Sequence, residues 1–266
     1  MAEIVGVVNI TEDSFSDGGL FLDQGEAIQQ GERLLDEGAT WLDLGAQSSN
    51  PVGGHQVSIE TELARLAPII RHFKDGGARV SVDTYKPAVM RGVIDLGADM
   101  INDVTGLREP EAVDLLARHP GVGVVVMHAR NRGPRAETIA RPYRDLIPEI
   151  RTYFEHRIRE LTAHGVARDR IVLDPGMGYF LGGNAEASLW VLKHLGELRS
   201  LGPLYVSTSR KSFIGSVLGG APRERAVGTL ATELWALLQG ASYIRTHEVR
   251  QLVQAWTMWQ AIDTVE

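Results

Sequence analysis

Short apolar runs rich in β-branched residues alternate with longer polar and apolar segments along the whole chain. Runs of this length, bounded by turn residues, are typical of buried strands rather than helices. The pattern predicts eight strands, at residues 4–10, 41–46, 79–84, 100–105, 122–128, 171–177, 204–209 and 243–247.

Between these strands, apolar residues recur at helical spacing. The clearest amphipathic segments are residues 26–37, 59–73, 87–96, 147–164 and 224–239. A Gly-Ala pair precedes several strands, at Gly38, Gly97 and Gly240, where a helix end and a tight connection to the next strand are expected. Regular alternation of strand and helix predicts a parallel sheet.

Eight strand–helix units in 266 residues favour a closed (β/α)8 barrel, the TIM barrel of the α/β class, as a single domain over residues 1–266. No change in composition marks a linker. The alternative architecture is an open, doubly wound sheet with a similar number of strands.

Composition narrows the class of protein further. With 44% hydrophobic residues the chain can build a large core, and with no cysteine it can form neither disulfides nor thiolate metal sites. A formal net charge of −7 argues against nucleic acid as the main partner. Neither a leader nor a membrane span is evident, so we expect a cytoplasmic protein that does not associate with membranes.

Polar side chains stand where each predicted strand ends, which is the active-site face of a barrel. Any single Asp or Asn there could simply cap the next helix, but a cap does not explain all eight positions. The strand ends carry Asn9, Asp43, Asp83, Asn102, His128, Asp174, the Ser209-Arg-Lys-Ser212 segment, and Arg245 with His247.

These residue types suggest two subsites. Asp83, Asn102 and Asp174 could bind a flat heterocycle with an amidine-like edge through paired hydrogen bonds. Lys211, Arg245 and His247 could hold a phosphate or pyrophosphate, with Asn9 as an oxygen ligand for Mg²⁺, although His247 alone could equally be a core histidine. Neither a zinc motif nor a compelling Ser-His-Asp arrangement is present.

The strand ends belong to longer sequence blocks that follow one another along the chain. The blocks are Val8-Asn-Ile-Thr-Glu-Asp-Ser-Phe-Ser-Asp-Gly-Gly19, Ser81-Val-Asp-Thr84, Ile101-Asn-Asp-Val104, Asp174-Pro-Gly-Met-Gly178, Ser209-Arg-Lys-Ser-Phe-Ile-Gly215 and Arg245-Thr-His247. Together they resemble the dihydropteroate synthase family, nearly along the whole chain and in the order expected of that family. The family is a TIM barrel that joins 6-hydroxymethyl-7,8-dihydropterin pyrophosphate to p-aminobenzoate, forming 7,8-dihydropteroate and pyrophosphate.

The resemblance implies a role for each matching residue. It places the pterin at Asp83, Asn102, Met127, Asp174 and Lys211. It places the pyrophosphate at Asn9, Ser49, Arg245 and His247, with Asn9 as the Mg²⁺ ligand, and the p-aminobenzoate at Phe15, Pro51, Tyr179, Phe180, Ser209 and Lys211. It also implies a dissociative reaction in which a pterin-stabilised cation forms before the amine attacks.

Two loops depart from the ordinary family pattern. In Gly45-Ala-Gln-Ser-Ser-Asn-Pro-Val52, Gln47 replaces the usual glutamate and Asn50 replaces the usual arginine. After strand six, Tyr179-Phe-Leu-Gly182 replaces the usual Phe-Gly-Lys. These departures resemble the Sul-type synthases that confer sulfonamide resistance, and they predict that Phe180, or its neighbour Tyr179, excludes the larger drug.

Four alternatives remain open from the sequence. The chain could be an ordinary sulfonamide-sensitive synthase, a pterin-binding protein that lost catalysis through Asn50, a pterin-dependent methyltransferase, or an unrelated barrel enzyme. The family is usually dimeric, so we expect a homodimer. The apolar last helix, around residues 252–262, could form that interface or merely close the barrel.

Overall fold

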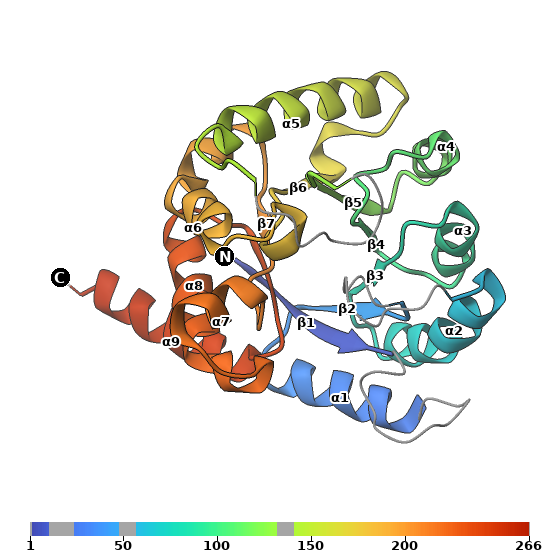
Figure 1. Cartoon of the computed structure of the whole chain (residues 1–266). Helices are drawn as coiled ribbons and strands as arrows, with labels where there is room; N and C mark the ends of the chain where they lie inside the picture. Colours follow the sequence, from blue (N-terminus) through green and yellow to red (C-terminus); the bar gives the residue numbers. More distant parts are fainter. Residues whose placement is uncertain (1, 11–23, 48–56, 132–140, 266) are drawn as a thin grey trace.

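The computed structural model describes residues 2–10, 24–47, 57–131 and 141–265. Its strands are all parallel to their neighbours, in the order β6-β5-β4-β3-β2-β1-β8-β7, and they surround a central axis (Figure 1). A single bridge between Leu173 and Leu204 joins β6 to β7. The predicted (β/α)8 barrel is therefore confirmed. The strands are β1 (Glu3–Asn9), β2 (Trp41–Gly45), β3 (Val80–Asp83), β4 (Met100–Asp103), β5 (Gly123–Met127), β6 (Ile171–Asp174), β7 (Tyr205–Val206) and β8 (Tyr243–Thr246).

Helices surround the barrel (Figure 1). The five helices predicted from periodicity are confirmed to within a few residues, and α4, α6 and α7 are additional. These three helices are short, spanning 9, 9 and 7 residues. The helices are α1 (Gln24–Asp36), α2 (Ile59–Asp75), α3 (Pro87–Asp95), α4 (Pro110–Arg118), α5 (Leu146–Ala163), α6 (Ala185–Lys193), α7 (Ser212–Leu218), α8 (Ala226–Leu238) and α9 (Val249–Asp263).

Most predicted strands are longer than the observed ones, and β7 differs most. The pattern predicted residues 204–209, but only Tyr205–Val206 pair within the sheet. Beyond that point the chain turns, with the Lys211 amide donating to the Thr208 carbonyl at 3.1 Å. The residues after Val206, which are Ser207, Thr208 and Ser209, are buried but polar, and they belong to this turn rather than to the strand.

The interior of the barrel has an apolar floor. The floor consists of Val5, Trp41, Met100, Val125, Val172 and Tyr205, with Tyr243 packed against them. Because side chains alternate along a strand, the residue two positions after each floor residue also points into the barrel, one layer closer to the mouth. On five strands this second layer holds a polar residue or a methionine: Asp43, Asn102, Met127, Asp174 and Arg245.

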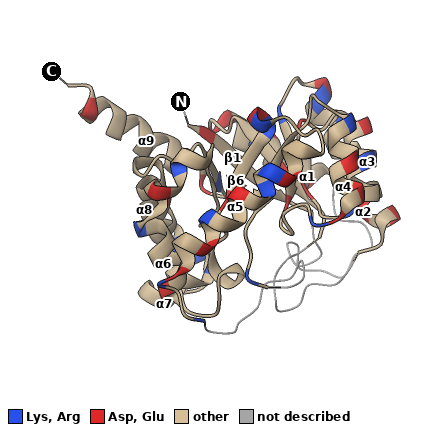
Figure 2. Cartoon of the chain, turned by 90° about the horizontal axis from the view of Figure 1, so that it is seen from above, with Lys and Arg blue, Asp and Glu red and all other residues tan. Residues whose placement is uncertain are grey.

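The last helix serves partly to complete the fold. Val249 and Leu252 are buried, and Trp256 packs against the main core between strands and helices. Met258 and Ile262 further along α9 are 61% and 63% exposed. Figure 2 shows α9 leading away from the barrel on the side where both chain ends lie. Among the described helices, none is both long and apolar enough to cross a bilayer.

Candidate active site

The centre of the barrel mouth is organised by a buried carboxylate, Asp43. Its Oδ1 accepts a hydrogen bond from Ser81 Oγ at 2.6 Å, and its Oδ2 accepts from Asn102 Nδ2 at 3.2 Å. Arg245 Nε also donates to Oδ2, at 2.6 Å. One carboxylate thereby joins four strands, β2, β3, β4 and β8. Sequence reasoning noted Asp43 only as a strand end and missed this role, because nothing local indicates its partners.

Arg245 connects this network to Asp83. Its Nη2 lies 3.4 Å from Asp83 Oδ2, at the end of β3. Burial raises the pKa of Asp83 to about 7, although the guanidinium opposes the shift, and Asp43 raises it further. Burial alone would lower the pKa of Arg245, but Asp43 and Asp83 outweigh it and raise that pKa. Arg245 thus stays charged, while Asp83 can bind a ligand with or without its proton.

Asp174 and Lys211 form the opposite side of the mouth. Burial raises the pKa of Asp174, and the nearby Lys211 ammonium partly offsets this increase. The Gly176 amide donates to Asp174 Oδ1 at 2.8 Å. Burial lowers the pKa of Lys211 to about 8, with Asp174 opposing. The Lys211 ammonium also donates to the Met177 carbonyl at 3.3 Å. The lysine is therefore held beside the carboxylate without a direct ion pair to it.

Glycines in the segment after β6 are required by close approach. Gly176 has φ of +75°, and a Cβ there would lie 2.3 Å from the His128 carbonyl oxygen. Gly178 has φ of +66°, and its amide donates to Ser188 Oγ at 2.8 Å. The Asp174-Pro-Gly-Met-Gly178 motif therefore fixes a backbone turn that other residues would strain.

An apolar wall completes the site on the β4–β6 side. Met127, Val104 and Phe180 pack together, and Tyr179 and Tyr85 lie against them. Phe180 is only 7% exposed, and the Lys211 Nζ lies 5.7 Å from the centre of its ring. The unusual aromatic segment therefore lies beside the predicted pterin residues, with Phe180 turned inward.

Ser209 and His247 are bonded to each other. The His247 amide donates to Ser209 Oγ at 3.1 Å, and the same Oγ lies 2.8 Å from His247 Nδ1. The ring tautomer of His247 decides which of Ser209 Oγ and His247 Nδ1 donates this bond. Burial lowers the pKa of His247 to about 3, and Arg245 and Arg210 lower it further. The ring is therefore neutral at neutral pH rather than a cation.

Arg210 has a structural role within the Ser-Arg-Lys-Ser segment. Its φ is +59°, and its guanidinium donates twice to Glu248 Oε1, at 2.8 and 2.7 Å. Thr229 Oγ1 accepts from its amide at 3.0 Å. This anchored turn sets the positions of Ser209 and Lys211 at the mouth.

Asn9 ends β1 at the rim of the mouth, next to Gly45, where a Cβ would lie 3.8 Å from Asn9 Oδ1. Within the described ranges, no cluster of three or more His, Cys, Asp or Glu side chains could hold a metal ion. The candidate residues Phe15, Ser49 and Pro51, and also Asn50, lie outside the described residues.

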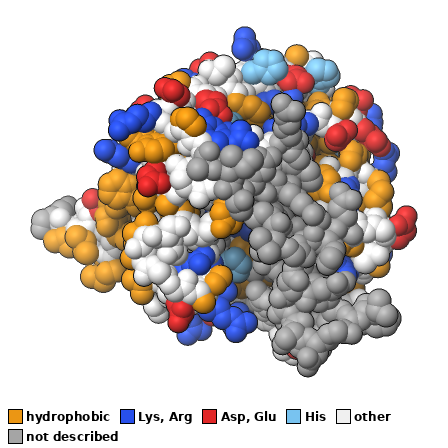
Figure 3. Space-filling model, in the orientation of Figure 1, with side chains coloured by type: hydrophobic (Ala, Val, Ile, Leu, Met, Phe, Trp, Pro, Cys, Tyr) orange, Lys and Arg blue, Asp and Glu red, His pale blue; other side chains and the backbone are white. Residues whose placement is uncertain are grey.

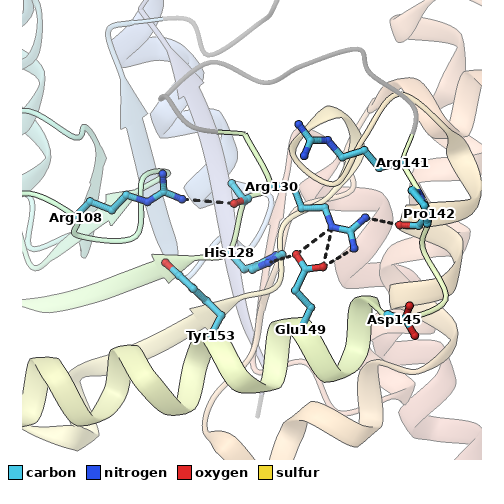
Figure 4. Close-up of a pocket in the computed structure, with 9 residues that line it drawn as sticks. Arg108, His128, Arg130, Arg141, Pro142, Asp145, Glu149 and Tyr153 are labelled. Atoms are coloured by element: carbon cyan, nitrogen blue, oxygen red, sulfur yellow. Dashed lines mark hydrogen bonds and ion pairs between the residues drawn. The ribbon is translucent and has the colours of Figure 1, made fainter.

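A cavity of 620 Å³ lies between the end of β5 and α5 (Figure 4). In it Glu149 lies between His128 and Arg130: Arg130 Nε donates to both carboxylate oxygens at 3.0 Å, and His128 Nε2 lies 3.2 Å from Oε1. Burial would raise the pKa of Glu149, but these two partners lower it to about 2. Tyr153 Oη donates to the Met127 carbonyl at 3.0 Å. These contacts tie the end of β5 to α5 and so fix Met127.

Comparison with known proteins agrees with this geometry. The family model described as pterin binding enzyme matches residues 5–247, so fold and site define a pterin-binding barrel enzyme. The type-3 dihydropteroate synthase of Escherichia coli is 42% identical over 264 residues, which cover 98% of this chain and 100% of that protein. The type-2 synthase of the same species is 43% identical over 251 residues, or 94% and 92% of the two chains. The chain belongs to the dihydropteroate synthase family and is a transferase.

A solved structure shows the same likeness. The dihydropteroate synthase of Xanthomonas albilineans with 4-aminobenzoic acid superposes with a TM-score of 0.88 at 38% identity, over 100% of this chain and 94% of that one. The predicted family is confirmed, as is the predicted likeness to the Sul-type enzymes, through the type-2 and type-3 relatives.

Proposed function

We propose that the barrel mouth binds the pterin ring of 6-hydroxymethyl-7,8-dihydropterin pyrophosphate. The observation that carries this is the convergence of buried acceptors and donors from β3, β4, β6 and β7 beside one apolar wall. Carboxylates and an amide match the donor-rich edge of a pterin, and a methionine packs on its face. The proposed pterin residues are Asp83, Asn102, Met127, Asp174 and Lys211.

The diphosphate is proposed to lie over β1 and β8. Arg245 supplies a charge that burial does not remove, and the neutral His247 ring is proposed to donate a hydrogen bond from Nε2. Ser49 is included in the proposed diphosphate site only because its position in the sequence resembles that of the family. Mg²⁺ in proteins commonly takes one or two protein oxygens and completes its coordination with phosphates and water. The residues present fit such an ion, with Asn9 as the protein ligand and the diphosphate as the main one. Bound there, the ion would neutralise charge on the leaving group.

The reaction needs no nucleophilic side chain. The C–O bond to the diphosphate breaks, both electrons leave with the pyrophosphate, and the cation at the exocyclic methylene is captured by the aromatic amine, which then loses a proton. The positive charges of Lys211 and Arg245 stabilise the negative charge that develops on the departing pyrophosphate.

The p-aminobenzoate is proposed to lie against Tyr179 and Phe180, next to Ser209 and Lys211, with Phe15 and Pro51 contributing by sequence match. The Xanthomonas albilineans relative holds 4-aminobenzoic acid, which supports this substrate. Phe180 is proposed to exclude sulfonamides, because its buried ring leaves little room for the group that replaces the carboxylate.

Two alternatives are less well supported. A pterin-dependent methyltransferase has no need for the anchored Ser209-Arg-Lys segment or for a charged Arg245. A non-catalytic pterin binder would retain the pterin pocket, and only an activity assay separates it from the synthase.

A homodimer is proposed, formed through the helices near the C-terminus. Figure 3 shows apolar side chains gathered at the edge of the molecule near α9. Exposed apolar side chains that gather in one place are typical of protein–protein interfaces. The exposed apolar residues on α7, α8 and α9 are Val217, Leu218, Val227, Trp235, Leu238, Met258 and Ile262.

The decisive experiment measures dihydropteroate formation from the two substrates with Mg²⁺, with and without sulfamethoxazole at a concentration that blocks an ordinary synthase. Product in both conditions supports a sulfonamide-insensitive synthase. Product only without drug would remove the resistance proposal, and no product in either would favour the non-catalytic binder. Omitting Mg²⁺ in a parallel reaction tests the proposed cofactor.

A further inference from the structure

A buried ion pair lies behind the mouth, between α2 and the segment after β3. Glu62 is 1% exposed and accepts hydrogen bonds from Thr84 Oγ1 and Lys86 Nζ, each at 2.7 Å. The Lys86 side chain is only 16% exposed. A lysine this enclosed is held in one position by its acceptors.

The other two protons of the Lys86 ammonium go to the segment after β2. Gln47 Oε1 accepts at 2.8 Å, and the Val57 carbonyl accepts as well. The Val57 amide lies 3.4 Å from the same Gln47 oxygen. Lys86 thus holds two residues that are ten apart in the sequence, and it fixes the position of the Gln47 side chain.

Lys86 also fixes which way the Gln47 amide points. An ammonium can only donate, so the Gln47 oxygen must face Lys86 and the NH₂ group must face the other way. There Nε2 lies 3.0 Å from Tyr85 Oη. Because Nε2 can only donate, Tyr85 Oη accepts this bond, and the phenolic proton must point to a different acceptor.

Tyr85 stands at the mouth. It follows Asp83, the last residue of β3, by two residues, and Thr84 between them bonds to Glu62 on α2. Its half-buried ring packs against the wall that contains Val104, Met127 and Phe180. The hydroxyl is therefore held at the edge of the proposed pterin pocket.

We propose that the Tyr85 hydroxyl donates a hydrogen bond to dihydropterin pyrophosphate, and that Gln47, held by Lys86, is the positioning residue that keeps its proton available. This inference rests on the proposed pterin site. A glutamate at position 47, as in most of the family, would instead accept the phenolic proton. With Gln47 in place of that glutamate, the phenolic proton of Tyr85 is not donated to residue 47 and is left to bind the substrate.

The test uses Tyr85→Phe, Gln47→Glu and the double variant. Each single change should raise the KM for dihydropterin pyrophosphate about fivefold, the value of one neutral hydrogen bond, while the KM for p-aminobenzoate and the Tm stay unchanged. The double variant should be no worse than either single one, because both remove the same proton. If Gln47→Glu acted only through its new charge, the two effects would multiply, and that result would overturn the proposal.

Calorimetry with separate probes gives a second measurement. Tyr85→Phe should weaken binding of 6-hydroxymethylpterin or of inorganic pyrophosphate with Mg²⁺, and unchanged affinity for both would refute the assignment. An increase in the KM for p-aminobenzoate alone would refute it too. Asp174→Asn tests the underlying pocket independently: if that variant binds pterin normally, the proposed site itself is wrong, whatever Tyr85 does.

Discussion

Arg245 Nε lies 2.6 Å from Asp43 Oδ2, although the two residues are 202 positions apart in the sequence. Asp43 is fully buried and also accepts hydrogen bonds from Ser81 and Asn102. The guanidinium is consequently held at one depth in the barrel mouth, where it also reaches Asp83. A cation that stabilises negative charge on a leaving diphosphate is more effective when its position is fixed before the reaction.

Asp43→Asn should lower kcat/KM about 100-fold, since the amide keeps the shape but removes the charge that positions Arg245, and breaking a buried pair costs about 3–5 kcal/mol. Steady-state kinetics with dihydropterin pyrophosphate as the varied substrate measures the change. Glu3→Gln is the matched control: it breaks the Glu3–Arg79 pair, which has the same 2.6 Å separation but lies at the surface, and should leave kcat/KM within twofold. Equal effects of the two changes would contradict the role given to Asp43.

Phe180→Gly should sensitise the enzyme to sulfonamides. Removing the buried ring opens space beside Lys211, so the IC50 of sulfamethoxazole should fall at least about tenfold, while the KM for p-aminobenzoate changes by less than about threefold. Inhibition curves at matched substrate saturation measure this. Tyr179→Phe, which removes only a hydroxyl from the neighbouring residue, serves as the control. A Phe180→Gly enzyme that remains active and resists the drug like the parent would disprove the proposal.

Ser209→Ala should alter His247 without removing it. The variant lacks the hydroxyl that bonds Nδ1, so the neutral ring is no longer held in one tautomer, and the KM for dihydropterin pyrophosphate should rise about tenfold. Nitrogen NMR of labelled histidine reports the tautomer directly. Because the His247 pKa is about 3, no ionisation of this ring should be visible between pH 5 and 9 in the parent. A titration of His247 near neutral pH would show that its environment is different.

Glu233→Met should stabilise the protein at alkaline pH. Glu233 is fully buried, and burial raises its pKa to about 8, outweighing the opposing interaction with Thr246. The folded state keeps a proton that the unfolded state releases above pH 4.5, so the parent loses stability as the pH rises from about 4.5 to 8. The variant lacks this ionisation and does not lose that stability. The difference in free energy of unfolding between variant and parent should therefore be larger at pH 8 than at pH 4.5, by on the order of 1 kcal/mol or more. Urea unfolding at both values measures the gain. A difference between variant and parent that does not change with pH would contradict it.

Much of the fold could be predicted from the sequence, because the barrel repeats one local pattern. Buried strands and amphipathic helices leave periodic signals, and the Gly38, Gly97 and Gly240 turns have the positive φ that their Gly-Ala pairs predicted. The short helix α7 and the brief strand β7 could not be predicted in the same way. Their conformations depend on contacts such as Arg210 with Glu248, which distant residues supply.

Five of the predicted site residues lie together at the mouth, but the contacts that connect them were not predicted. Asp83, Asn102, Asp174, Lys211 and Arg245 do meet at the mouth, as strand ends in a barrel must. His247, predicted to bind pyrophosphate, follows β8 at the same mouth, and burial together with Arg245 and Arg210 lowers the pKa of its ring, which favours the neutral form there. Asp43 and the Lys86–Gln47–Tyr85 contacts were not foreseen, since each joins segments with no sequence signal in common.

The sequence by itself therefore determined the architecture, the family and the chemical types present at the mouth, because periodicity and ordered motifs are local properties of a chain. Tertiary structure alone decided which groups are charged, which way each proton points, and which side chain holds another in place. Those properties depend on burial and on partners brought together from distant strands, and no local pattern of residues records them.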